Sequence, residues 1–210
     1  MKSRVNINSV LTYILVLIIV LGAVFIVGAW IVSAVFPEFQ IRSVLGNDGI
    51  RWLLGHFTEN VCTPLLVWIV LLAFSYGCME RSGLLSDLSK AFFDRGNTKF
   101  GFRSRIGVVI VAVELFVVII IMSLLTVVPH AVLLSVDGTL FPSSFSDSLV
   151  PVLSFTLLLC STTYGITTNH FRTVRSWGES LAYGLSRCSM FVAVYFAAAE
   201  LYAIIRFVIG

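Results

Sequence analysis

Two acidic residues lie inside long apolar runs, and they are the positions where this sequence could most directly do chemistry. They are Glu114 in the run VAVELFVV and Glu200 in the run AAAELYAII. A carboxylate at bilayer depth is costly unless it is protonated, paired or hydrated, so such residues often bind a proton or a cation. The alternative is a neutral acid that forms an interhelical hydrogen bond, and the sequence leaves both interpretations open. Arg206 follows Glu200 by six residues, which is not the i+3 or i+4 spacing that brings helical side chains together.

The sequence contains no recognisable catalytic or metal-binding motif. The cysteines have no C-x-x-C spacing and the histidines lie in separate segments, so neither a disulfide nor a metal site is expected. These residues are Cys62, Cys78, Cys160, Cys188, His56, His130 and His170. The H-E-x-x-H, G-x-S-x-G, P-loop and dinucleotide-binding motifs do not occur. We therefore expect a protein that is not an enzyme and that needs no cofactor.

The two acids must be positioned by membrane helices, because the composition is that of a membrane protein. Hydrophobic residues make up 58% of the chain and charged residues 12%, which is about half the charged share of a typical soluble domain. Apolar runs of roughly 18 or more residues can cross the bilayer. Five are present, at about 10–36, 61–79, 106–128, 148–167 and 188–209. The apolar core of the first run is longer than that of a signal peptide, so we interpret it as a retained helix. The sequence predicts an all-α polytopic membrane protein with about five transmembrane helices in a single membrane domain, 1–210.

The distribution of basic residues predicts the orientation of these spans. Eleven of the fourteen Lys and Arg residues fall in the N-terminal tail, the second loop and the fourth loop. Because cytoplasmic loops hold the excess of positive charge, we expect the N-terminus inside and the C-terminus outside. A cysteine introduced at Ser144 should then be labelled from outside, and one at Asn97 should not. The net charge of +3 reflects this topology, and no basic patch interleaved with aromatic residues indicates nucleic acid binding.

A first block of motifs spans residues 46–85 and begins with an interfacial segment. An Arg-Trp pair suits the membrane surface, a proline suits the start of a helix, and a glycine suits the end of one. These residues stand in Gly49-Ile50-Arg51-Trp52, in Pro64, and in Glu80-Arg81-Ser82-Gly83-Leu84. In order and spacing the block resembles the early region of the AbgT family of p-aminobenzoyl-glutamate transporters, so 10–85 resembles the first two spans of that family.

A second block extends the resemblance over residues 106–210. It comprises LLTVVP at 124–129, DSLVPVLSFTLLLCSTTYGITT at 147–168 and MFVAVYFAAAELYAII at 190–205. The matching positions include Pro151, Tyr164 and Gly165, and the block is similar to the fifth to seventh spans of the family. Glu200 stands one residue beyond the position where the family commonly has Gln, so the resemblance implies no role for it.

The resemblance also implies which family parts this sequence lacks. Full members are longer and carry two re-entrant hairpins and further spans, which form their substrate-binding core. The helices matched here correspond to the outer framework and the dimer contact of the family. Small residues four apart, as in Ala193-x-x-x-Ala197 and Ala199-x-x-x-Ala203, also favour close helix association.

Three functions follow from these observations, each for a protein of the bacterial inner membrane. The first is a reduced, homodimeric framework in the lipid bilayer that supports transport with a second polypeptide supplying the transport core. The second is a compact ion-coupled transporter or channel that acts alone through Glu114 and Glu200. The third, an unrelated five-span assembly factor, is the least favoured because the two motif blocks occur in order.

Overall fold

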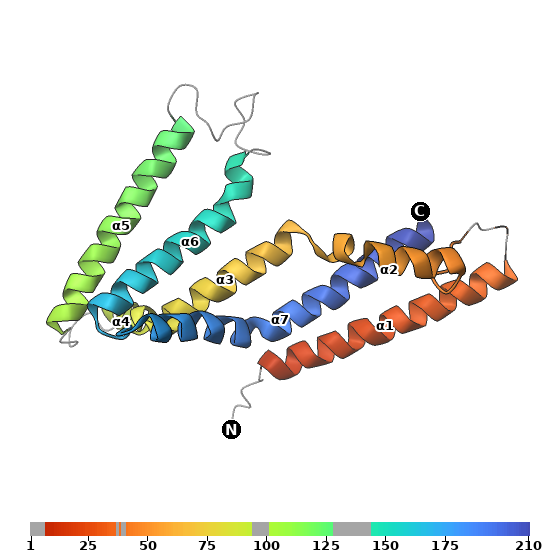
Figure 1. The fold of residues 1–210 in the computed structure, drawn as a ribbon, viewed down its shortest axis with the longest axis horizontal. Helices are drawn as coiled ribbons and strands as arrows, with labels where there is room; N and C mark the ends of the chain where they lie inside the picture. Colours follow the sequence, from red (N-terminus) through yellow and green to blue (C-terminus); the bar gives the residue numbers. More distant parts are fainter. Residues whose placement is uncertain (1–6, 37, 39–40, 94–100, 128–143) are drawn as a thin grey trace. The chain divides into compact units, whose positions relative to one another are not determined.

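The computed structural model describes residues 7–36, 38, 41–93, 101–127 and 144–210, and all regular structure in these ranges is helical (Figure 1). The helices are α1 (Ile7–Val35), α2 (Asn47–Val61), α3 (Pro64–Arg81), α4 (Leu84–Phe93), α5 (Phe102–Val127), α6 (Ser144–Thr167) and α7 (Val174–Ile209). Asn97, His130 and the predicted end of the third span at 128 lie outside the described residues.

Five of these helices, α1, α3, α5, α6 and α7, are long and apolar enough to cross a membrane. This confirms the predicted all-α fold with five transmembrane helices. The inside or outside location of the termini stays a prediction from the distribution of basic residues.

The two remaining helices are short and amphipathic. Helix α2 carries the Gly-Ile-Arg-Trp segment in its first turns, with Arg51 exposed and Trp52 half-buried. Its mixture of apolar and charged residues is typical of a helix at the membrane surface. Helix α4 follows Gly83 directly, and the sequence analysis did not predict it.

Helix α7 begins fourteen residues earlier than the fifth span predicted at 188–209. The segment from Val174 to Arg187, which the sequence analysis placed in a loop between spans, is therefore helical. Its charged residues are compatible with a helix because Arg175 and Glu179, at i and i+4, form an ion pair of 3.0 Å on the exposed face.

The chain forms two compact units, and α3 and α7 contribute residues to both. The first unit comprises 1–69 and 188–210, and the second comprises 70–187. The core of the first unit joins α1, the segment before α2 and the end of α7. Its buried residues are Ala29, Val44, Ile204 and Val208.

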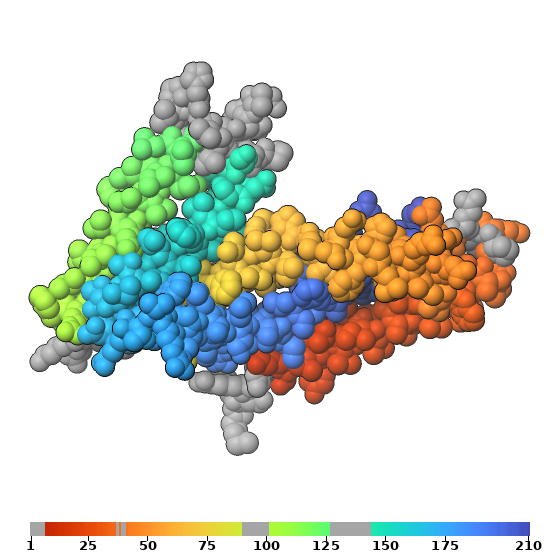
Figure 2. All heavy atoms as spheres, viewed as in Figure 1, coloured from red at the N-terminus to blue at the C-terminus, as the bar shows by residue number. Residues whose placement is uncertain are grey.

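The second unit is held together by close contacts between helix backbones. A Cβ atom on Gly184 of α7 would collide with the backbone of α3 at Ala73 and Gly77, so only glycine fits there. Helices α5 and α6 lie side by side (Figures 1 and 2), and Gly107 of α5 packs against the ring of Tyr164 on α6. Small residues thus let the spans of this unit approach closely.

Candidate functional site

The Glu-Arg-Ser-Gly motif forms the turn between α3 and α4. Gly83 has a φ of +79°, in the region that side chains with a Cβ rarely adopt. The buried Ser82 hydroxyl donates to the Met79 carbonyl at 3.2 Å and accepts from the Leu84 amide at 3.3 Å. The motif therefore ends α3 and begins α4, which is a structural role.

The acid and base of this motif contact the first part of α7. The Tyr183 hydroxyl donates to Glu80 Oε1 at 3.0 Å and accepts from Arg187 Nε at 3.1 Å. The Arg81 guanidinium lies 5.1 Å from the centroid of the Tyr183 ring, and that of Arg187 lies at 5.8 Å, both within the range of cation–π attraction. Glu80 and Arg81 therefore fasten α3 to α7 through one tyrosine.

The Tyr-Gly motif of α6 connects α6 to neighbouring segments of the unit formed by residues 70–187. Tyr164 is fully buried, and its hydroxyl donates to Asp87 Oδ2 of α4 at 2.6 Å. Gly165 leaves room for the ring of Phe171, whose amide donates to the Gly165 carbonyl at 2.9 Å. Pro151 lies inside α6, where it removes one backbone hydrogen bond of the helix.

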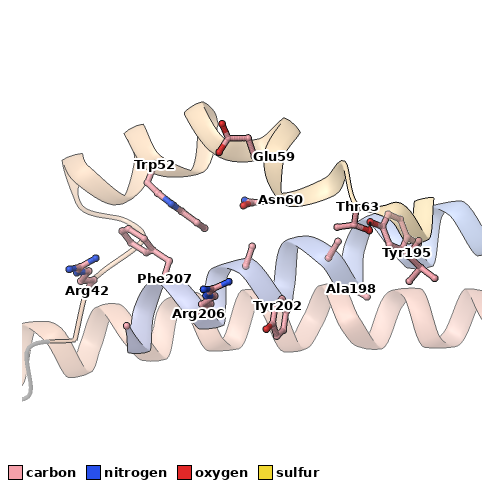
Figure 3. Close-up of a pocket in the computed structure, with 14 residues that line it drawn as sticks. Arg42, Trp52, Glu59, Asn60, Thr63, Tyr195, Ala198, Tyr202, Arg206 and Phe207 are labelled. Atoms are coloured by element: carbon pink, nitrogen blue, oxygen red, sulfur yellow. Dashed lines mark hydrogen bonds between the residues drawn. The ribbon is translucent and has the colours of Figure 1, made fainter. Parts of the chain in front are cut away.

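A groove of about 720 Å³ lies between α2 and the last turns of α7 in the first unit (Figure 3). Trp52 of α2 stacks on Phe207 of α7 with 4.3 Å between ring centroids. Tyr195 is nearly buried on the opposite side, and its hydroxyl bonds to the Val61 carbonyl at 2.7 Å and to Thr63 Oγ1 at 2.5 Å. A ring stack at one end and the hydrogen bonds of Tyr195 at the other therefore hold α2 against α7.

The motif residues Gly49 and Pro64 at the start of α2 and α3 have structural roles and do not line the groove. Gly49 is buried, and a Cβ atom there would overlap the backbone of Ser43 and Val44. Pro64 is the first residue of α3, where its missing N–H costs no helical hydrogen bond. Arg51 points to an exposed surface and does not line the groove.

Glu200 lies next to the groove, and its carboxyl group lacks hydrogen-bond partners. Both carboxylate oxygens are buried without a hydrogen-bond partner of good geometry, and so is Nδ2 of Asn60, which lines the groove. The Asn60 amide is near enough to the Glu200 carboxyl to interact with it. A buried carboxylate without a strong partner must bind a proton, a cation or water.

Glu114 has a different environment, at the contact of α5 and α6. Its Oε2 atom is buried without a hydrogen-bond partner, and its carboxyl interacts with the buried thiol of Cys160 on α6. Glu114 belongs to the unit of residues 70–187 and Glu200 to the other unit. The two acids are thus separate candidates, each with one polar neighbour on another helix.

Sequence reasoning missed the polar neighbours of the two acids. Asn60 is far from Glu200 in the chain, as Cys160 is from Glu114, and nothing in their local patterns indicates that they meet. Within the described ranges, no three His, Cys, Asp or Glu side chains gather in a way that could hold a metal ion. His56 contacts its own helix at the Trp52 carbonyl, and His170 lies beside Gly83.

Comparison with curated proteins finds no match, and neither does comparison with solved structures. A family model described as the AbgT putative transporter family matches residues 94–208, which is more than half of the 210 residues. The match covers most of the second motif block, including Pro151, Tyr164 and Gly165, whereas the first block, 46–85, lies outside it. The assignment of 10–85 to the first spans of the family therefore stays a prediction. The five helices that are long and apolar enough to cross a membrane agree with a family of membrane transporters. The chain belongs to the AbgT putative transporter family.

Proposed function

We propose that this member of a membrane transporter family is a reduced, dimeric framework of the bacterial inner membrane that supports transport together with a second polypeptide. The observation that carries the proposal is the packing of the unit formed by residues 70–187. Glycine contacts fix the backbones of α3 and α7 together, and Gly107 fits against Tyr164 between α5 and α6. Contacts of this kind suit a rigid frame, because neither side can shift without a collision.

Substrate sites in secondary transporters usually lie at helices that are broken near the middle of the membrane. Each described span of this chain is one continuous helix, although α6 contains Pro151. A second polypeptide that supplies discontinuous helices would complete the transport pathway. By resemblance to the family, its substrate would be p-aminobenzoyl-glutamate.

A compact ion-coupled transporter or channel is the second candidate, and Glu200 favours it. A carboxylate with both oxygens buried and unpaired, beside a groove of about 720 Å³, is suited to bind and release a proton. In this alternative the chain acts alone and needs no partner.

Flux measurements separate the two candidates. Liposomes that contain only the purified chain are loaded with a pH-sensitive dye and tested for proton flux, with and without p-aminobenzoyl-glutamate outside. The framework function predicts the same leak as in liposomes without protein. Proton flux that is present in the wild type and lost in Glu200→Gln or Glu114→Gln would establish the compact transporter instead.

Glu114 provides a stability readout for the same question. If it only joins α5 to α6, Glu114→Gln keeps the hydrogen-bonding shape and leaves the free energy of unfolding unchanged. Glu114→Leu then lowers that free energy by about 0.6–2 kcal/mol, the range for interhelical hydrogen bonds in membranes. Both variants are measured by thermal unfolding in detergent. A Gln variant as unstable as the Leu variant would show that the ionisable carboxyl itself is needed.

The dimer is tested by single-molecule photobleaching of labelled chains in liposomes at several protein densities. Two bleaching steps per particle are expected, and Ala197→Leu reduces them to one if that face of α7 forms the contact. Ala199 belongs to the groove, so Ala197 is the better test position. A chain that stays monomeric at every density would eliminate the dimeric framework.

A further inference from the structure

The groove between α2 and α7 has a basic end. Arg42 and Arg206 both line it and are both exposed. The Arg42 guanidinium lies 6.0 Å from the centroid of the Phe207 ring, and Arg206 is the neighbour of Phe207 in the chain. Among the residues that the structure describes, neither guanidinium has a carboxylate partner within ion-pair distance. Figure 3 shows both arginines on the Phe207 side of the groove.

Away from the arginines, α7 lines the groove mainly with small side chains. Ala198, Ala199 and Ala203 lie there beside the larger Tyr195 and Tyr202, and α2 lines the other side. From Tyr195 to Gly210 the groove follows α7 for about 22 Å, at ~1.5 Å per residue. Its arginines are near the end of the helix, and its alanines lie deeper in the membrane-spanning segment.

The rim of the groove lies on helices that cross the membrane, so we expect it to face lipid. Leu65 at the start of α3 is 50% exposed and Tyr202 of α7 is 68% exposed, and both lie in helices that cross the membrane. An apolar chain can therefore enter sideways from the bilayer, whereas a small hydrophilic anion would have to pass this rim.

Three carboxylates near the groove could oppose an anion, and none forms an ion pair with its basic end. Glu200 is buried beside the alanines of α7, and both of its oxygens lack a hydrogen-bond partner. Glu59 lines the groove, but its side chain points away from the space between α2 and α7 (Figure 3). Asp48 is exposed and shares a smaller cavity with Arg42 at the start of α2. The groove thus keeps two cationic groups at one end and mainly uncharged side chains along its length.

We propose that this groove is a binding site for an anionic phospholipid. The phosphate accepts hydrogen bonds from Arg42 and Arg206, and one acyl chain lies along the alanines of α7. Guanidinium groups suit this role because their planar array of donors matches phosphate oxygens. The lipid would seal α2 against α7 at the membrane surface. This inference holds whether the chain acts as a framework or as a transporter.

Native mass spectrometry of the purified full chain tests the proposal, with phosphatidylglycerol, phosphatidylcholine and inorganic phosphate as separate probes. One phosphatidylglycerol should be retained in preference to phosphatidylcholine, and excess inorganic phosphate should not displace it. The double variant Arg42→Gln, Arg206→Gln should weaken the affinity about thirtyfold, since each arginine near an anionic lipid contributes about 1 kcal/mol. The matched control Arg51→Gln, Arg103→Gln removes two exposed charges elsewhere and should bind like the wild type.

A second variant tests the acyl chain. Ala198 is exposed, so Ala198→Phe fills the groove without disturbing a buried contact. It should reduce retention of phosphatidylglycerol, whereas Ala23→Phe on the exposed face of α1 should not. The proposal is overturned if the Arg42, Arg206 double variant or Ala198→Phe binds phosphatidylglycerol as well as the wild type does. It is also overturned if phosphatidylcholine is retained equally, or if inorganic phosphate displaces the lipid.

Discussion

The two units use small residues on the same helix, α7, with opposite results. In the unit of residues 70–187, Gly184 faces Ala73 and Gly77 of α3, and the two backbones leave no space between them. In the other unit, the alanines of α7 line a groove together with the large Trp52 of α2. A small residue therefore produces close packing only where its partner is also small. The same pattern opposite a large side chain produces a cavity.

The largest effect is expected at the closest contact. Gly184→Ala places a methyl group into the backbone of α3, which cannot move aside as a flexible side chain would. We expect a loss of about 3 kcal/mol in the free energy of unfolding, at the upper end for overpacked cores. Titration with dodecyl sulfate, followed by circular dichroism, measures it. Gly178→Ala is the matched control on the same helix, because its Cβ would meet open space. Equal stability of both variants would show that the backbones are not in contact.

A smaller effect is expected at the buried tyrosine of the same unit. Tyr164→Phe removes the hydroxyl that donates to Asp87 while keeping the ring that packs against Gly107. Hydrogen bonds to charged groups contribute about 1.5–3 kcal/mol, so we expect a loss in the lower half of that range. Tyr202→Phe, at a residue 68% exposed, serves as the control. The same unfolding titration applies, and no difference between the two would mean that the Tyr164 bond does not contribute.

The smallest effect is expected in the unit that contains the groove. A double-mutant cycle with Trp52→Leu and Phe207→Leu isolates the stacking of the two rings, which is worth about 0.5–1.5 kcal/mol. The coupling energy comes from thermal unfolding of the four proteins in detergent. If the coupling energy between Trp52 and Phe207 were as large as the unfolding free energy lost in Gly184→Ala, the contrast between a close-packed unit and an open one would not hold.

The sequence predicted the spans well because apolar runs need no knowledge of neighbours. It missed the first fourteen residues of α7, because the arginines at 175 and 187 and Glu179 resemble a cytoplasmic loop. These side chains are accommodated by local pairing, as between Arg175 and Glu179, which hydropathy does not detect. Helix α4 was missed because its ten residues are too few to cross a membrane, and the search for apolar runs detects only segments of that length.

The candidate site was only partly predictable. The local roles of Pro64 and Gly83 follow from backbone conformation, which each residue type determines by itself. The burial of Glu200 was expected from its apolar run. Its neighbour Asn60 and the groove were not, because they depend on how α2 meets α7, which are far apart in the sequence. Long-range pairings of this kind leave no periodic signal in a single chain.

Two arginines on the long helix α7 are spaced by about the thickness of a membrane. Arg187, which bonds to Tyr183, and Arg206, at the groove, are nineteen residues apart, so about 28 Å separates them along the helix at ~1.5 Å per residue. This is close to the roughly 30 Å of hydrocarbon in an ordinary bilayer. Both guanidinium groups can then reach the headgroups on opposite sides. A thicker bilayer would draw one of them toward the hydrocarbon and make the lipid thin around the helix. The helix is thus matched to one thickness, and acyl-chain length should set how readily the protein inserts and stays folded.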